Sequence, residues 1–177
     1  PEKSVYDKVS FYSVFGGSPY INSFIDSDKS LKENIISTVL NDTHPVFHYA
    51  EHLLITDFTN AVNAERIFYA ISNGKKKYGE IESKLKMKNN GLLSKQLSAL
   101  TGMEIISKVF PINKKDDNKK ISYEINDNLL RFYYAFIYKN RSALQVLGAN
   151  AFYDEYIEES LKQFVSFRFE EICRSFF

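Results

Sequence analysis

Glycine is scarce in this chain of 177 residues: only seven are present, and their spacings produce neither G-x-G-x-x-G nor G-x-x-x-x-G-K-[ST]. This excludes a Rossmann fingerprint and a Walker A phosphate loop from the chain itself. The single cysteine, Cys173, excludes an internal disulfide framework and is typical of a reducing compartment. There is no apolar run of 18 residues and no signal-peptide pattern, so we expect a cytoplasmic protein without a membrane span.

The charged residues are unevenly distributed along the chain. The formal net charge is only +1. Residues 1–62 carry 4 basic and 8 acidic side chains, residues 63–125 carry 13 and 7, and residues 126–177 carry 6 and 7. The positive charge is therefore concentrated in the middle third, where we expect any electrostatic partner to bind.

The first third has the pattern of a helical bundle. The apolar run over residues 9–15 stops at Gly16-Gly17, and Ser18-Pro19 then resembles a helix start with serine at the N-cap and proline at the first helical position. Ser30 and Glu33 are spaced as a capping box for a helix that continues to Leu40. A further helix is expected near residues 46–58.

The middle third predicts three helices followed by a hairpin. Asn63 is placed to cap the first helix, and a second helix is predicted over residues 78–86. Leucines recur at helical spacing over 93–100, which predicts the third helix. The segments Glu104–Ile112 and Ile121–Ile125 are predicted strands. This order is typical of a winged helix-turn-helix.

The last third is predicted to be a helical connector, which makes the whole chain mainly α. Asp127 is placed to cap an aromatic helix, and residues 140–150 are expected to form a looser stretch. A final helix is predicted from Phe152 to the terminal Phe176-Phe177 without a stop signal. Because of that uncapped end and a first residue that is Pro1, we expect the natural chain to continue on both sides.

Three stretches resemble one protein family, the archaeal-type P-loop ATPases related to the AAA+ and STAND class. Residues 12–20 (YSVFGGSPY) resemble its Gly-Gly-x-Pro-Tyr stretch, and residues 127–140 resemble the aromatic block after its winged helix. Residues 169–174 resemble the opening helix of its C-terminal PD-(D/E)XK nuclease-like domain. The resemblance covers essentially the whole chain, in order.

The resemblance implies that this chain is the middle of a larger ATPase. An ATPase core would precede it and most of a nuclease-like domain would follow, both being partners within the same protein. Residues 1–62 would be the helical lid, residues 63–125 the winged helix, and residues 126–177 the connector and the start of the nuclease-like domain. ATP and Mg²⁺ would be cofactors of the full protein, while this chain alone would hold no cofactor and no complete active site.

The resemblance also implies roles for particular residues. Gly16, Gly17 and Pro19 would approach the bound nucleotide, because glycine permits close backbone approach and a helix start offers N–H groups. Glu170 would join the metal site of the nuclease-like domain, where its partner carboxylates would lie beyond this chain. This chain by itself is therefore predicted to be no enzyme and to hold no metal.

The winged helix predicts contacts with the phosphate backbone of duplex DNA. If Leu93, Leu97 and Leu100 face inward, Lys95 lies on the opposite face, and basic residues also occur at the helix start and in the wing. The candidate DNA-contacting residues are Lys88, Asn89, Asn90, Lys95, Ser98, Lys114, Lys115, Lys119 and Lys120.

Two alternatives remain open. The predicted third helix has no arginine, Leu92 lies near its exposed side, and Asp116-Asp117 at the wing tip would repel phosphate. These features favour a protein docking module that does not bind DNA. The other alternative is a zinc peptidase, because residues 48–52 match H-x-x-E-H and His44 lies four positions earlier. Such a site requires three ligands in an enclosed pocket, and Pro45 makes His44 a boundary residue, so we interpret the histidines as partly exposed helix residues.

Overall fold

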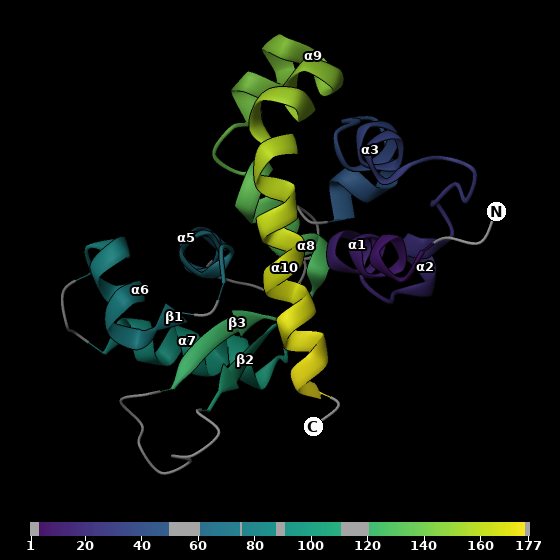
Figure 1. Cartoon of the computed structure of the whole chain (residues 1–177). Helices are drawn as coiled ribbons and strands as arrows, with labels where there is room; N and C mark the ends of the chain where they lie inside the picture. The colour runs from purple at the N-terminus through teal and green to yellow at the C-terminus, as the bar shows by residue number, and fades with distance from the viewer. Residues whose placement is uncertain (1–3, 50–60, 75, 88–90, 111–120, 176–177) are drawn as a thin grey trace. The chain divides into compact units, whose positions relative to one another are not determined.

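The chain forms two compact units in a computed structural model that describes residues 4–49, 61–74, 76–87, 91–110 and 121–175. Unit 1 combines residues 1–53 with residues 128–177, and unit 2 comprises residues 54–127. The first and last parts of the sequence thus share one unit, and the middle part forms the other (Figure 1).

Unit 1 is built from helices, with a short further helical stretch at residues 45–49. Its elements are α1 (Val5–Phe15), α2 (Pro19–Asn22), α3 (Leu31–Asn34), η1 (Ile35–Val39), α8 (Asn128–Phe132), η3 (Tyr133–Ile137), α9 (Arg141–Tyr156) and α10 (Glu158–Ser175). Helix α1 packs against α8 and α10 (Figure 1), and the π-helical turns η1 and η3 both pack against α9.

The core of unit 1 is largely aromatic. The Phe132 ring lies 4.9 Å from that of Phe136 and 5.7 Å from that of Phe164, measured between centroids. These rings join α8, η3 and α10, and Phe152 of α9 is also fully buried. The aromatic block seen in the sequence is therefore interior packing, where large rings bury much apolar surface.

Side-chain caps define two helix starts in unit 1. The Ser30 hydroxyl accepts the Glu33 N–H, and the Glu33 carboxylate accepts the Ser30 N–H at 2.8 Å, which confirms the predicted capping box. A second capping box, formed by Ser4 and Asp7, starts α1 four residues before the predicted apolar run. Pro19 occupies the first position of α2, as predicted.

The expectation of a looser stretch over residues 140–150 is wrong, because α9 spans Arg141–Tyr156. The helical pattern is hidden in the sequence because Val146 and Leu147 are exposed and, among the described residues of this helix before Phe152, only Leu144 is buried. The helix is interrupted at Gly148, where φ is +75° and ψ is 164°. Helix α10 then begins separately, so the predicted final helix is divided between two elements.

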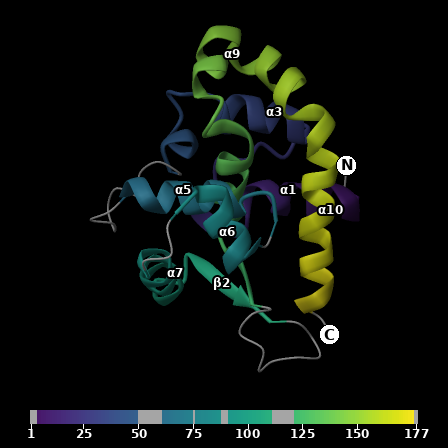
Figure 2. The ribbon, with the colours of Figure 1, turned by 90° about the vertical axis from the view of Figure 1, so that its left-hand side faces the viewer.

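Unit 2 is a winged helix-turn-helix with three strands. Its elements are α5 (Ala61–Ile71), β1 (Lys76–Lys77), α6 (Tyr78–Leu85), α7 (Leu92–Gly102), β2 (Ile106–Val109) and β3 (Ser122–Ile125). The antiparallel sheet has the order β1-β3-β2, with Ile106 opposite Ile125. Helix α7 packs against β2 (Figure 2), and Leu93, Leu97 and Leu100 are buried as predicted.

Three details of unit 2 differ from the sequence prediction. Helix α5 begins at Ala61, so Asn63 lies inside it and is not its N-cap. Strand β1 was not expected, because two lysines carry no strand signal and form a strand here only by pairing with β3. Strand β2 ends at Val109, so the predicted Glu104–Ile112 strand is shorter than expected.

The fold class is mainly α, a helical bundle with a small antiparallel sheet, as the sequence indicates. Among the described residues, no helix has the combination of length and apolar character that crossing a bilayer requires.

Candidate functional site

The turn after α1 has a backbone conformation that requires glycine. Gly16 has φ +72° and ψ −161°, a region that side-chain-bearing residues rarely enter. Its N–H donates to the Tyr12 carbonyl at 2.9 Å and closes the last turn of α1. Gly17 lies against the Tyr12 ring, since a Cβ there would sit 3.7 Å from Tyr12 Cε2. The Gly16–Pro19 segment is thus a shaped connection between two helices.

Asn128 holds this turn in place from the start of α8. Its Nδ2 donates to the Tyr12 carbonyl at 2.6 Å, so that carbonyl accepts two hydrogen bonds, one from Gly16 and one from Asn128. Asn128 is 3% exposed, and its Oδ1 has no hydrogen-bond partner among the described residues. Sequence reasoning assigned Asn128 no role, although a polar residue opening an apolar aromatic helix was the available signal.

The exposed face of α7 lies opposite its three buried leucines. Lys95 and Ser98 are exposed on that face, where the sequence placed them. Ala99 and Gly102 are exposed as well, so small residues follow Lys95 on this face, whereas the larger Leu92 lies one turn before it. The other candidate DNA-contacting residues, Lys88, Asn89, Asn90, Lys114, Lys115, Lys119 and Lys120, lie outside the described residues.

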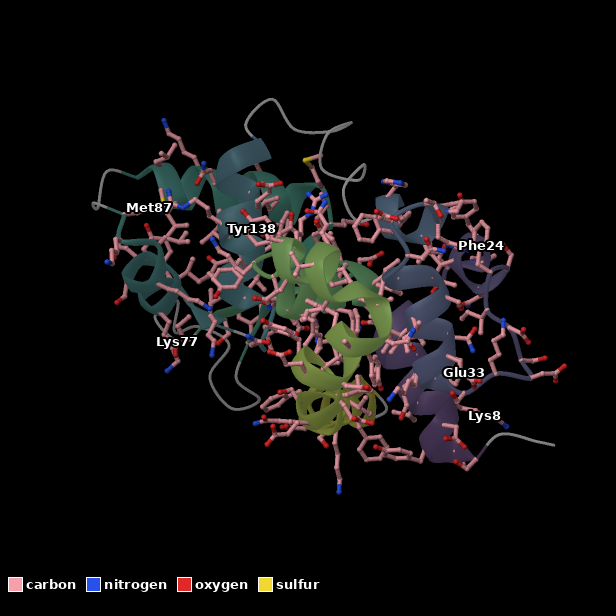
Figure 3. The ribbon with its side chains drawn as sticks, turned by 90° about the horizontal axis from the view of Figure 1, so that it is seen from above. Lys8, Phe24, Glu33, Lys77, Met87 and Tyr138 are labelled. Atoms are coloured by element: carbon pink, nitrogen blue, oxygen red, sulfur yellow. The ribbon has the colours of Figure 1, made fainter. Side chains whose placement is uncertain are left out.

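Two further lysines flank a tyrosine across the sheet of unit 2. Lys76 of β1 and Lys108 of β2 are both paired with Tyr123 of β3, which places the three residues on one face of the sheet. Burial raises the pKa of Tyr123, with a smaller contribution from Tyr78. The neighbouring Lys77 is exposed at the surface of unit 2 (Figure 3). The basic side chains of the middle segment therefore lie on the sheet as well as on the helices.

Lys84 has a structural role in unit 2. Its ammonium group lies 4.6 Å from the centroid of the Tyr69 ring and donates to the Tyr69 carbonyl at 3.3 Å. Burial lowers the pKa of Lys84, and the charge of Lys76 lowers it further. These contacts join α6 to α5 through one side chain.

Large apolar side chains are also exposed on unit 2. Leu92 at the start of α7 is 40% exposed, and Met103 and Phe110 have similar exposure. Exposed apolar groups next to basic ones fit a protein-binding surface as well as a nucleic-acid interface.

The acidic and histidine candidates lie in unit 1. Glu170 is exposed on α10, and the side chain of Glu171 is outside what the structure describes. The His44 Nδ1 accepts the Val46 N–H at 3.1 Å and so caps the helical residues 45–49, which confirms its predicted boundary position. Burial lowers the pKa of His44. Within the described ranges no three His, Cys, Asp or Glu side chains are grouped to hold a metal, and His52 lies outside those ranges.

Comparison with known proteins shows where the similarity lies. Residues 133–177 match a family described as "Archaea bacterial proteins of unknown function" (DUF234). A protein of Methanocaldococcus jannaschii, described as uncharacterized, is 26% identical over 176 residues. That alignment covers 98% of this chain and 38% of the relative, so the chain spans well under half of the relative's length. No solved structure matches significantly.

Proposed function

We propose that this chain is the lid and winged-helix part of an archaeal-type P-loop ATPase and couples ATP state to DNA binding. The family matched by residues 133–177 is associated with archaeal ATPase-like proteins, and the aligned relative is much longer than this chain. The observation that carries the proposal is the winged-helix topology of unit 2 with basic side chains exposed on α7 and the sheet.

DNA contact in this proposal is directed mainly at the phosphate backbone. Lys95 on α7 and Lys108 on β2 are exposed cations, and the small residues Ser98, Ala99 and Gly102 permit close approach of the α7 backbone. Lysine binds phosphate as a point charge, whereas arginine is the commonest side chain that reads guanine. We therefore expect binding that depends strongly on salt and weakly on sequence.

The nucleotide side of the proposal rests on the Gly16–Pro19 turn. In the whole protein, Gly16, Gly17 and Pro19 would lie next to ATP and Mg²⁺ bound by an upstream core. Glu170 would belong to a downstream nuclease-like domain. The chain alone is proposed to have no enzymatic activity, and the longer protein is proposed to act in the cytoplasm.

A salt series of duplex DNA binding tests the DNA interface. The double variant Lys95→Ala/Lys108→Ala is compared with the wild type and with Lys8→Ala/Lys162→Ala, a control that removes the same charge from unit 1. If both lysines contact phosphates, the slope of log K against log salt falls by about 2. The control should keep the wild-type slope. Undetectable binding of the wild type at low salt would refute the DNA role.

The second candidate function is a protein docking module, favoured by the exposed Leu92, Met103 and Phe110. In this case unit 2 binds the ATPase core of the same protein and does not contact DNA. Leu92→Glu should then abolish co-purification of the core with this chain, while Lys95→Ala leaves it intact. Co-purification that survives Leu92→Glu would refute docking through this surface.

A further inference from the structure

Unit 1 contains a cavity that the sequence did not reveal. Its volume is about 620 Å³, which is in the range of small-molecule sites. One wall is formed by η1 with the residues that follow it, and the other by α9, which packs on η1. None of its lining residues belongs to the Gly16–Pro19 turn or to unit 2, so the cavity shares no residue with the proposed nucleotide and DNA sites.

Two backbone irregularities occur in the walls of this cavity. The π-helical turn η1 spans Ile35–Val39, and residues of this turn and just after it line one side. On the other side, α9 is interrupted at Gly148, which itself lines the cavity. No heavy atom lies within 4 Å of a Cβ built at Gly148, so glycine is required there by its positive φ and not by crowding. Single π-helical turns are frequent at functional sites.

The cavity combines an apolar floor with a polar rim. Leu40, Phe47 and Leu144 are each less than 8% exposed and supply the floor. Arg141 lines the rim, and its guanidinium carbon lies 5.9 Å from the centroid of the Phe47 ring. A guanidinium group is always charged and presents a planar set of donors, which matches carboxylate, phosphate and sulfonate groups.

The rim carries a permanent cation and an acid. Arg141 comes from α9, and the exposed Asp42 comes from the turn after η1. Asn41 is used within that turn, where its Oδ1 accepts the Thr43 N–H at 3.1 Å. Gln145 is exposed one helical turn after Arg141 and so lies on the same side of α9. Arg141 and Gln145 thus bring N–H donors to the α9 wall, while Asp42 and His48 line the other wall.

We propose that this cavity binds a small organic anion with an aromatic or aliphatic body. The acidic group pairs with the Arg141 guanidinium, and the body lies over Phe47 between Leu40 and Leu144. Burying the apolar body supplies affinity, and the charge-assisted hydrogen bonds fix its orientation. Such a ligand contacts Leu40, directly after η1, as well as α9, so its binding holds these two parts of unit 1 together.

Titration with 8-anilinonaphthalene-1-sulfonate, a fluorescent organic anion, tests this site. The wild type should bind about one dye per chain saturably. Arg141→Gln, which retains polarity but loses the charge, should bind about tenfold to a hundredfold more weakly. Lys162→Gln, an exposed change on α10, is the matched control and should bind as the wild type does. Equal affinity in Arg141→Gln and the wild type would overturn the proposal.

Two more variants keep the test decisive if Arg141→Gln unfolds. Gln145→Glu adds a carboxylate at an exposed rim position and should weaken dye binding, because the two anions repel. Ala149→Trp fills the cavity and should abolish saturable binding. If both variants bind like the wild type, the dye occupies exposed apolar residues such as Val146, and the cavity is not the site.

Competition with the bound dye by naphthalene derivatives identifies which charged group the cavity recognises. Naphthalene-1-sulfonate, 1-naphthoate and 1-naphthyl phosphate should each displace the dye, and their order of potency separates sulfonate, carboxylate and phosphate ligands. The cation 1-naphthylmethylammonium has the same body and should not compete. Displacement by this cation as strong as by the anions would refute recognition of an acidic group.

Discussion

The Asn128 side chain donates a hydrogen bond to the Tyr12 backbone carbonyl at 2.6 Å, across 116 positions of the sequence. Asn128 is the first residue of α8, and the chain passes from unit 2 back into unit 1 at this point. The bond therefore attaches the return of the chain directly to the end of α1, next to Gly16. In the proposed ATPase, α8, which follows unit 2 directly in the chain, is thus hydrogen-bonded to the end of the helix that precedes the proposed nucleotide segment.

Two replacements of Asn128 should destabilise unit 1 to different extents, and their order tests the hydrogen bond to the Tyr12 carbonyl. Asn128→Ala should cost about 1–2 kcal/mol of unfolding free energy, because a buried donor and its packing are lost. Asn128→Asp should cost more, since a buried carboxylate cannot donate to the Tyr12 carbonyl and loses its hydration. Urea unfolding measures both, with the exposed Asn150→Ala as control. If Asn128→Asp were tolerated better than Asn128→Ala, donation to Tyr12 would not be the important contact.

The two adjacent glycines should differ sharply in their tolerance of alanine. Gly16→Ala should cost about 1–3 kcal/mol, because φ +72° with ψ −161° is a conformation that alanine resists. Gly17 has no positive φ, and a Cβ there would make only an ordinary contact, so Gly17→Ala should have a small effect. Thermal or urea unfolding of the two variants gives this comparison. Equal losses would show that backbone strain at Gly16 is not decisive.

Stability should fall in mildly acidic solution because of His44. Burial lowers its pKa in the folded state below 6.5, so the unfolded chain takes up the proton first. The contribution of His44 is complete above about pH 6.5 and is lost as the pH falls through the folded pKa. His44→Asn keeps an acceptor for the Val46 N–H but cannot titrate. Melting temperatures from pH 8 to pH 5 should therefore fall less steeply in this variant than in the wild type.

Lys32 joins α3 to the region where α9 meets α10. Its ammonium group lies 2.5 Å from Asp154 and 3.5 Å from Glu158, and the hydrogen bond to Asp154 is the main reason that the pKa of Lys32 is raised. The raised pKa means that this stabilisation is present below pH 10.5 and is lost as the pH rises through the folded pKa.

Lys32→Met should accordingly lower the melting temperature slightly at low salt and have less effect at high salt, because these charges are exposed. Lys29→Met is the matched control, since Lys29 pairs locally with Asp26 three positions away. Thermal unfolding at both ionic strengths measures the difference. A loss that does not depend on salt would assign the role of Lys32 to its packing over the Tyr153 ring.

Local signals explain which elements were predictable. The Ser30 capping box, the Pro19 helix start and the leucines of α7 each depend on contacts within one or two helical turns, and all three are present in the structure. The elements that were missed carry no local apolar pattern. Strand β1 exists because Lys76 and Lys77 pair with the distant β3, whereas α9 is helical although few of its residues before Phe152 are buried.

The candidate sites also differ in whether the local sequence pattern could predict them. The exposed face of α7 follows from helical periodicity alone, so Lys95 and Ser98 were placed correctly by the sequence. The role of Asn128 and the cavity beside Arg141 were not predictable, because each brings together segments about a hundred residues apart.

Composition and short-range pattern by themselves determined that this chain is mainly helical, lacks a phosphate loop and has its positive charge in the winged helix. These properties depend on residue counts and on spacings of three to seven residues. Only the tertiary structure decided that the first and last parts of the chain fold together and that a cavity lies between η1 and α9. The physical reason is that burial of an apolar face is favourable whichever segment covers it. An apolar pattern therefore does not identify the distant segment that packs against it.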